Sequence, residues 1–212
     1  MNFIIFGPQG SGKGTQAEKL AEKFNLSHLE TGQIFRDIAQ EDSLLSAKIS
    51  ALIKAGEVVP DDITVEILQR FVAQVPAEQG LILDCAPRTL GQIEPVETMM
   101  AQHSRKIEKA IYISLPYEQS VARITKRYLC AACAKPLVLG RDIENATDSC
   151  PTCGGQITQR ADDTPEGISK RLDIFYAVTL PVIEEYRKRG MLIEIDGSQN
   201  VEAVFADIIA KL

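Results

Sequence analysis

One glycine-rich segment near the start of the chain carries the clearest sign of chemistry. Residues 7–15 read GPQGSGKGT, follow the short apolar run at 3–6 and precede a helix-patterned segment over 15–24. Glycines allow backbone N–H groups to turn toward a polyphosphate, and the N-terminus of the following helix adds partial positive charge. Lys13 supplies a mobile charge for the outer phosphates. The segment therefore predicts a phosphate-binding loop, in a variant that places Gly14 between the lysine and Thr15.

Four of the five cysteines form two close pairs in the second half of the chain. Two residues separate Cys130 from Cys133, sixteen residues follow, and Cys150 and Cys153 repeat the first spacing. Each pair can chelate one edge of a tetrahedral ion, and four thiolates leave no open coordination position. The pattern predicts a structural metal site that holds zinc, with iron as the alternative. The fifth cysteine, Cys85, is interpreted as a small buried side chain.

Charged residues that can meet phosphates or magnesium are spread along the rest of the sequence. Asp84 and Arg88 follow an apolar run at 81–83, and open α/β folds bind ligands at the carboxyl ends of their strands. Asp84 can hold the water shell of Mg²⁺, and Arg88 can face the phosphate loop. Arg123 and Arg127 are four residues apart and are expected on one helix face. Other arginines that can complete the set are Arg36, Arg160 and Arg171, whereas His28 and His103 lack a ligand pattern and are interpreted as structural or exposed.

The alternation of apolar and amphipathic segments indicates which elements position these residues. Buried parallel strands are expected at 3–6, 81–83, 110–114 and 191–195, because each is a short continuous apolar run. Helices are expected over 15–24, 32–39, 44–55, 64–75, 117–127 and 165–189, the last bent or interrupted at Pro181. Over 128–163 the periodicity fades into an insertion rich in turn residues. The order predicts an α/β fold with a parallel sheet covered on both faces.

The composition of the 212-residue chain excludes several functions. A net charge of −6 and a sequence pI of about 5.1 argue against duplex binding, which normally requires a basic face. The sequence contains no run of about twenty apolar residues, the length that a membrane-spanning helix requires. Its first residues lack the features of a secretion signal. The paired cysteines suit a reducing compartment. The chain is therefore expected to act in the cytoplasm, on a small polyanion, without nucleic-acid or membrane partners.

These motifs together resemble those of the adenylate kinases, and the similarity runs essentially from end to end. The matching residues are Gly7–Gln16, Thr31 and Gly32 with Arg36, Asp84 with Pro87–Thr89 and Gln92, Arg123, Arg127, Arg160 with Asp162 and Asp163, Arg171, and Asp196 with Gly197. The cysteines are similar to those of the subgroup whose lid carries zinc. The resemblance implies a monomer that converts MgATP and AMP reversibly into two ADP, with Mg²⁺ as cofactor and structural Zn²⁺ in the lid.

The resemblance also implies a division of the chain and a role for each matching residue. It implies a P-loop core with a five-stranded parallel sheet over residues 1–29, 60–126 and 165–212, a helical AMP-binding insertion over 30–59, and a small zinc-knuckle lid over 127–164. The implied ATP site is Gly10, Ser11, Gly12, Lys13, Gly14, Thr15, Arg123, Arg127 and Gln199. The implied AMP site is Thr31, Arg36, Glu57, Val58, Val59, Cys85, Arg88, Gln92, Arg160 and Arg171. The implied catalytic residues are Lys13, Asp84, Arg88, Arg123, Arg160 and Arg171, and the metal ligands are Cys130, Cys133, Cys150 and Cys153.

The sequence departs from the family pattern in three places. Cys85 and Ala86 stand where the family usually has Gly-Phe, and Gln33 replaces a customary aspartate. Residues 135–137 read KPL where relatives often carry a hydroxyl residue and an aromatic one. Two other functions stay open: a kinase for another monophosphate such as UMP or CMP, and a non-enzymatic nucleotide-sensing P-loop protein with a zinc ribbon.

Overall fold

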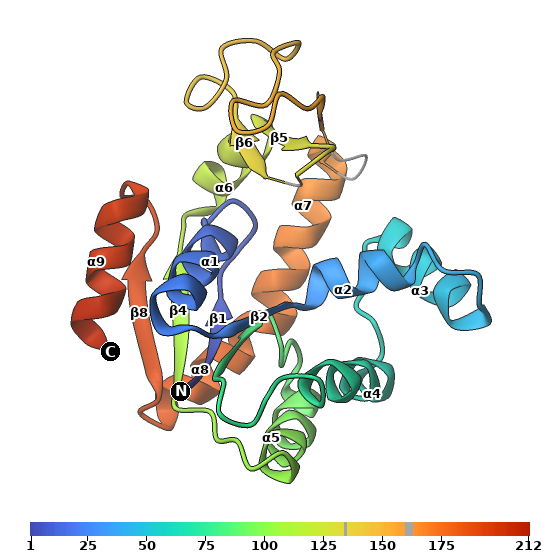
Figure 1. The fold of residues 1–212 in the computed structure, drawn as a ribbon, viewed down its shortest axis with the longest axis vertical. Helices are drawn as coiled ribbons and strands as arrows, with labels where there is room; N and C mark the ends of the chain where they lie inside the picture. The colour runs from blue at the N-terminus through green and yellow to red at the C-terminus, as the bar shows by residue number, and fades with distance from the viewer. Residues whose placement is uncertain (134, 160–162) are drawn as a thin grey trace.

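A five-stranded parallel sheet forms the centre of the protein, with strand order β2-β3-β1-β4-β8 (Figure 1). The computed structural model describes residues 1–133, 135–159 and 163–212. The strands are β1 (Asn2–Phe6), β2 (Ser27–Glu30), β3 (Leu81–Asp84), β4 (Lys109–Ser114) and β8 (Leu192–Asp196). Ile5 of β1 pairs with both Asp84, the last residue of β3, and Ile111 of β4, which continues to Ser114. The α/β fold with a five-stranded parallel sheet is confirmed.

Helices cover both faces of this sheet, which explains why β1 is apolar from Phe3 to Phe6. Phe3 and Ile5 pack in a cluster with α1 (Lys13–Phe24) and α9 (Val201–Lys211). Ile4 and Phe6 point to the opposite face, where they pack with α4 (Asp61–Val72), α5 (Ile93–Gln102) and α8 (Leu180–Lys188). Successive strand residues face opposite sides of a sheet, so a strand covered on both sides carries consecutive apolar residues.

Two helices between β2 and α4 extend to one side of the sheet, at the right of Figure 1. They are α2 (Thr31–Ile38) and α3 (Leu44–Ala55), and α3 has the limits expected from its pattern. Ser43 and Ser46 form a reciprocal capping box at the start of α3, which satisfies two backbone N–H groups. The segment that follows α3 returns to the cleft described below.

A second, three-stranded antiparallel sheet lies at the top of Figure 1, above α6 (Tyr117–Ile124) and α7 (Pro165–Ile174). Its strands are β5 (Arg127–Cys130), β6 (Pro136–Val138) and β7 (Ile157–Thr158), in the order β6-β5-β7. Its apolar cluster is small, with buried residues Cys130, Leu137, Ile143, Cys150 and Ile157. A core of this size stabilises a fold weakly by itself.

The helix expected over 117–127 is shorter than its pattern predicts. Helix α6 ends at Ile124, and the Thr125 hydroxyl donates to the carbonyl groups of Val121 and Ala122 at 3.1 Å each. Arg127 is then the first residue of β5, so the prediction that Arg123 and Arg127 share a helix face is wrong. The helix ends early because Arg127 instead pairs with Val138 in the small antiparallel sheet.

The long helix expected over 165–189 is interrupted, as Pro181 predicts. A π-helical turn, η2 (Phe175–Thr179), separates α7 from α8, and Pro181 lies in the first turn of α8. A single 3₁₀ turn, η1 (Leu90–Gln92), precedes α5. Within the described ranges, no helix combines the length and the apolar character that a membrane crossing requires.

Candidate functional site

The phosphate loop connects β1 to α1 at the carboxyl edge of the sheet. Gly10 and Gly12 adopt φ values of 81° and 86°, a left-handed conformation that glycine adopts without the steric cost of a Cβ. The Ser11 N–H donates to the Pro8 carbonyl at 3.1 Å, which closes the loop. Helix α1 begins at Lys13 with no side-chain cap, so its first N–H groups are available to an anion.

Lys13 is held by a buried carboxylate at the end of β3. Its Nζ lies 3.3 Å from Asp84 Oδ1, and the Asp84 side chain is 1% exposed. His28 Nε2 lies 3.3 Å from the other oxygen, Oδ2. Burial opposes ionisation of Asp84, but Lys13 and His28 hold the pKa of that carboxyl below its usual value. Burial likewise opposes the charge on Lys13, but Asp84 holds the pKa of the lysine above its usual value.

His28 is a site residue that the sequence analysis missed. It lies on β2, a strand of which only Leu29 is buried, so neither the strand nor the histidine had a recognisable pattern. Parallel pairing of β2 with β3 aligns Glu30 with Asp84 and brings the histidine within reach of the carboxylate. The structure thus places His28, which the sequence analysis interpreted as structural or exposed, against the carboxylate of the site.

A single cleft gathers the residues expected to hold the acceptor nucleotide. Segments far apart in the sequence form its walls: the phosphate loop with the start of α1, β2–α2, the segment after α3, the β3–η1 turn, and the start of β5 with α7. The lining residues to which the sequence analysis gave an ATP, AMP or catalytic role are Lys13, Thr31, Arg36, Glu57, Val58, Val59, Asp84, Cys85, Arg88, Gln92, Arg127 and Arg171. Five of these side chains are cationic, which suits a polyphosphate.

Several polar atoms in this cleft are buried and have no hydrogen-bond partner among the described residues. They include Gln9 Oε1, Thr31 Oγ1 and Arg88 Nε, all from residues that line the cleft. A buried polar atom without a partner costs roughly 1–3 kcal/mol, so native structures seldom leave several together. Their grouping indicates that a polar ligand completes the site.

Cys85 adopts a backbone conformation that normally requires glycine. Its φ is 65°, in the left-handed region, where an L-residue costs roughly 1–2 kcal/mol. Its N–H donates to the Ile5 carbonyl at 3.0 Å, so the backbone is held in place at the end of β1. The departure from the family pattern therefore keeps the glycine-like backbone and adds a half-buried thiol to the cleft.

Gln33, the second departure, supports an arginine of the cleft. Its Oε1 accepts from Arg36 Nε at 3.1 Å and from Arg36 Nη2 at 2.8 Å. Arg36 Nη2 also donates to Glu30 at 2.9 Å. These contacts fix the guanidinium at the cleft wall.

Arg123 ties the phosphate loop to the turn that follows β8. Its Nη1 donates to the carbonyl groups of Gly10 at 3.3 Å and Gly197 at 2.8 Å, and its Nη2 donates to the carbonyl of Ser198 at 3.1 Å. Gln199, in the same turn, donates to the Asp196 carbonyl at 3.2 Å. Arg123 and Gln199 thus lie beside the phosphate loop, away from the residues around Arg88.

Asp163 joins the start of the small sheet to helix α7. Its side chain is 1% exposed and accepts from Arg127 Nη2 at 2.7 Å and Arg171 Nη2 at 2.8 Å. Arg127 Nε adds a second parallel hydrogen bond at 3.0 Å. The carboxylate therefore holds two arginines of the cleft together from different elements. Arg160 and Asp162, expected near this point, lie outside the described residues.

The four paired cysteines form one compact sulfur cluster. Their ligand atoms all lie within 4.8 Å of one another, with Cys130 and Cys150 buried and Cys133 and Cys153 exposed. Burial opposes ionisation of Cys150, but backbone N–H groups of Thr152 and Cys153 and the neighbouring thiols lower its pKa to about 6. Four sulfur donors at this spacing fit a tetrahedral ion without an open position. The cluster can hold a metal ion.

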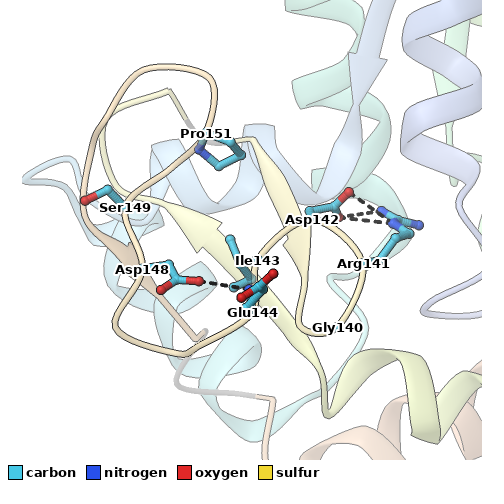
Figure 2. A pocket seen from close by; sticks show the side chains of 8 residues that line it. All are labelled: Gly140, Arg141, Asp142, Ile143, Glu144, Asp148, Ser149 and Pro151. Atoms are coloured by element: carbon cyan, nitrogen blue, oxygen red, sulfur yellow. Dashed lines mark hydrogen bonds and ion pairs between the residues drawn. The ribbon is translucent and has the colours of Figure 1, made fainter.

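The turns between β6 and β7 carry a hollow in which two of the three acidic side chains, those of Asp142 and Asp148, are already partnered. Figure 2 shows Asp142 paired with Arg141, at 2.7 Å, and Asp148 accepting from the backbone N–H of Glu144, at 2.8 Å. Asp142 Oδ2 also accepts from the Val138 N–H at 2.8 Å. These carboxylates organise the turns between β6 and β7, and we assign the hollow no ligand.

The chain is similar to known proteins over its whole length. Residues 5–191 match the model of one family, described as adenylate kinase. A protein from Syntrophomonas wolfei named adenylate kinase is 36% identical over 212 residues, which is 100% of this chain and 99% of the relative. Proteins of the same name from Methanocella arvoryzae and Archaeoglobus fulgidus are 34% and 36% identical, each over 100% of this chain and 98% of the relative.

Proposed function

Because the chain belongs to the adenylate kinase family, we propose that it transfers the γ-phosphoryl group of MgATP reversibly to AMP, giving two ADP. The observation that carries the proposal is the shared cleft. Lys13 of the phosphate loop lies in one wall, and Arg36 and Arg88 lie in the others. Two phosphate-binding groups that face one space suit a reaction between two phosphorylated substrates.

The chemistry follows from positioning and charge, because phosphoryl transfer leaves little covalent work to the protein. An oxygen of the AMP phosphate attacks the γ-phosphorus in line, and the bond to the departing ADP oxygen breaks. Lys13 stabilises the charge on the phosphates of the donor, while Arg88 holds the phosphate of the acceptor. Arg127 at the start of β5 and Arg171 on α7 are both held by Asp163 and add positive charge to the cleft. Arg160 belongs to the same proposed set by resemblance.

Magnesium fits the end of β3. Asp84 is a buried, ionised carboxylate beside Lys13, and Mg²⁺ in phosphate sites is commonly held through waters by one or two carboxylates. The ion, when bound with ATP, neutralises charge on the transferring phosphates. The remaining work is that of the chain's own residues, which orient both phosphates and exclude water.

We further propose three functional parts: a core over residues 1–29, 60–126 and 165–212, an AMP-binding insertion over 30–59, and a lid over 127–164 that holds structural zinc. The separate small sheet with its own cluster of five buried residues supports the lid assignment. The four sulfur donors support zinc, which stiffens a lid too small to build a large core. The family relationship and the acidic net charge of −6 support a cytoplasmic monomer that acts on free nucleotides.

A coupled assay of ADP formation tests this function. MgATP is offered with AMP, CMP, UMP or GMP in turn, and we expect a clear preference for AMP. Arg88→Ala should lower kcat/KM by about a hundredfold or more while leaving the unfolding midpoint within a degree or two, because a half-exposed cleft arginine contributes to charge stabilisation and not to the core. Wild-type activity with another monophosphate would move the substrate assignment. Absence of turnover with all four would favour a nucleotide-binding protein.

A further inference from the structure

Asp61 lies behind the wall of the acceptor pocket and has no role in the assignments above. It is the first residue of α4, is half-buried, and accepts a hydrogen bond from Gln92 Nε2 at 2.8 Å. Gln92 lines the cleft and leaves no surface to solvent. We propose that Asp61 is a positioning residue that sets the base preference of this pocket by fixing the orientation of the Gln92 amide. The inference rests on the proposed function, since it concerns the base of the acceptor nucleotide.

The two partners of the Gln92 amide allow only one orientation. A carboxylate can only accept a hydrogen bond, so the atom that faces Asp61 must be the amide nitrogen. The backbone N–H of Arg88 can only donate, and it lies 2.7 Å from Gln92 Oε1. A rotated amide would place its oxygen against the carboxylate and its NH₂ group against another donor. Because the Gln92 side chain is fully buried and both contacts are partly buried, water has little access with which to relieve either conflict.

Neighbouring groups hold the Asp61 carboxylate itself in place. The Thr89 hydroxyl lies 3.0 Å from each of its oxygens. A Cβ added at Gly91 would lie 2.6 Å from Asp61 Oδ2, so the backbone of η1 approaches the carboxylate as closely as glycine allows. The carboxylate is therefore held between the Thr89 hydroxyl and the backbone at Gly91. Its fixed position fixes the hydrogen bond that it accepts from Gln92.

The fixed amide leaves one N–H and one oxygen lone pair for a base. The amide nitrogen uses one of its two N–H groups on Asp61, and the oxygen uses one of its two lone pairs on the Arg88 backbone N–H. Adenine presents an acceptor ring nitrogen beside an amino donor, whereas hypoxanthine presents a donor ring N–H beside a keto acceptor. With the phosphate anchored at the arginines, the base cannot turn over to exchange these atoms. The pocket should therefore accept a 6-amino purine and reject the otherwise identical 6-keto purine.

The test compares AMP with IMP, because the two differ only at this edge. Binding of each nucleotide is measured by calorimetry, and kcat/KM is measured with MgATP as donor. Asp61→Asn is the main variant, since the new amide can accept or donate and no longer dictates the orientation of Gln92. Asp62→Asn is the matched control: it removes the same charge from the same helical turn, but the side chain is exposed.

We expect wild type and Asp62→Asn to bind AMP much more tightly than IMP. In Asp61→Asn the ratio of the binding constants for AMP and IMP should fall about tenfold, which corresponds to the loss of one hydrogen bond to a charged acceptor. The KM for ATP should stay unchanged. Gly91→Ala keeps the carboxylate but displaces it, and should lower the ratio in the same direction. Thr89→Ser retains the hydroxyl and should preserve the wild-type ratio.

An unchanged ratio in Asp61→Asn and Gly91→Ala would overturn the inference, as would a wild-type protein that binds AMP and IMP equally. Both results can be read from binding alone. A protein that binds AMP selectively without phosphorylating it would instead refute the proposed function and leave the positioning role supported.

Discussion

Removing the carboxylate that faces Lys13 is the perturbation whose effect follows most directly from the structure. Asp84→Asn keeps the shape of the side chain but withdraws its charge from Lys13 Nζ, 3.3 Å away. The ammonium then stands without its counter-charge at the end of β3. Breaking a buried ion pair by removing one partner costs about 3–5 kcal/mol when the remaining charge stays buried.

The expected cost is smaller here, because Lys13 keeps some access to water. Its side chain is 26% exposed, whereas that of Asp84 is 1% exposed. The freed ammonium can hydrate toward the cleft, so we expect Asp84→Asn to lower the free energy of unfolding by about 2 kcal/mol. Lys13→Met leaves the opposite problem, a buried carboxylate whose remaining side-chain partner among the described residues is His28, and should cost about 3 kcal/mol.

The double variant separates the ion pair from the rest of the site. Lys13→Met with Asp84→Asn leaves no uncompensated charge, so its cost should fall short of the sum of the single costs by about 2 kcal/mol. Urea unfolding followed by far-UV circular dichroism gives the three free energies, since the chain has no tryptophan for fluorescence. Additivity within about 0.5 kcal/mol would refute the argument, because it would mean that the two charges do not interact.

The same pair defines a pH dependence with a definite sign. The pKa of Asp84 is lowered in the folded protein, so its contribution is present above the unfolded value near 3.9 and is lost as the pH falls through the lower folded value. The pKa of Lys13 is raised, so its contribution is present below about 10.4 and is lost as the pH rises through the higher folded value. Between these limits the pair's contribution should be constant. In Asp84→Asn the loss of unfolding free energy at low pH that Asp84 causes should be absent.

Three further changes have expected outcomes. Cys85→Gly should raise the urea midpoint, because relief of the left-handed conformation, roughly 1–2 kcal/mol, exceeds the added chain entropy of glycine, while Cys85→Ala should give no gain. Chelation of the metal proposed at the four cysteines should open residues 127–164 to limited proteolysis and leave the core fragment resistant; an unchanged cleavage pattern would contradict a stabilising metal. Arg123→Met should raise the KM for ATP more than that for AMP, because it frees three carbonyl groups around the phosphate loop; equal changes in initial-rate kinetics would argue against this placement.

Local patterns predicted the parts of the fold that depend on short stretches of chain. The continuous apolar run at 3–6 predicts a strand covered on both faces, and β1 is fully buried. Helix α3 has the limits that its pattern indicates. The two cysteine pairs predicted one cluster because each pair is a local chelating unit. The glycine pattern predicted the loop before α1, since the positive φ values at Gly10 and Gly12 are a local requirement.

The elements without a recognisable pattern were those stabilised mainly by their neighbours. Strand β2 reads SHLE and has one buried residue, because it lies at the edge of the sheet and depends on β3 for its hydrogen bonds. Arg127 fits a helix by spacing, but pairing with Val138 in the small sheet decides its conformation. Propensity is weak beside tertiary pairing, so the helix ends before that residue.

The sequence alone determined the α/β class, the phosphate-loop variant, the sulfur cluster and the resemblance that leads to the family, because these depend on residue type and short spacing. Only the tertiary structure decided which side chains meet: His28 and Lys13 on the two oxygens of Asp84, Arg127 and Arg171 on Asp163, and Asp61 behind Gln92. Each of these contacts joins elements tens of residues apart or crosses a turn whose geometry depends on the packed sheet. These pairings of charges and hydrogen-bonding groups exist only when the strand ends have come together. No single segment of the chain therefore predicts them.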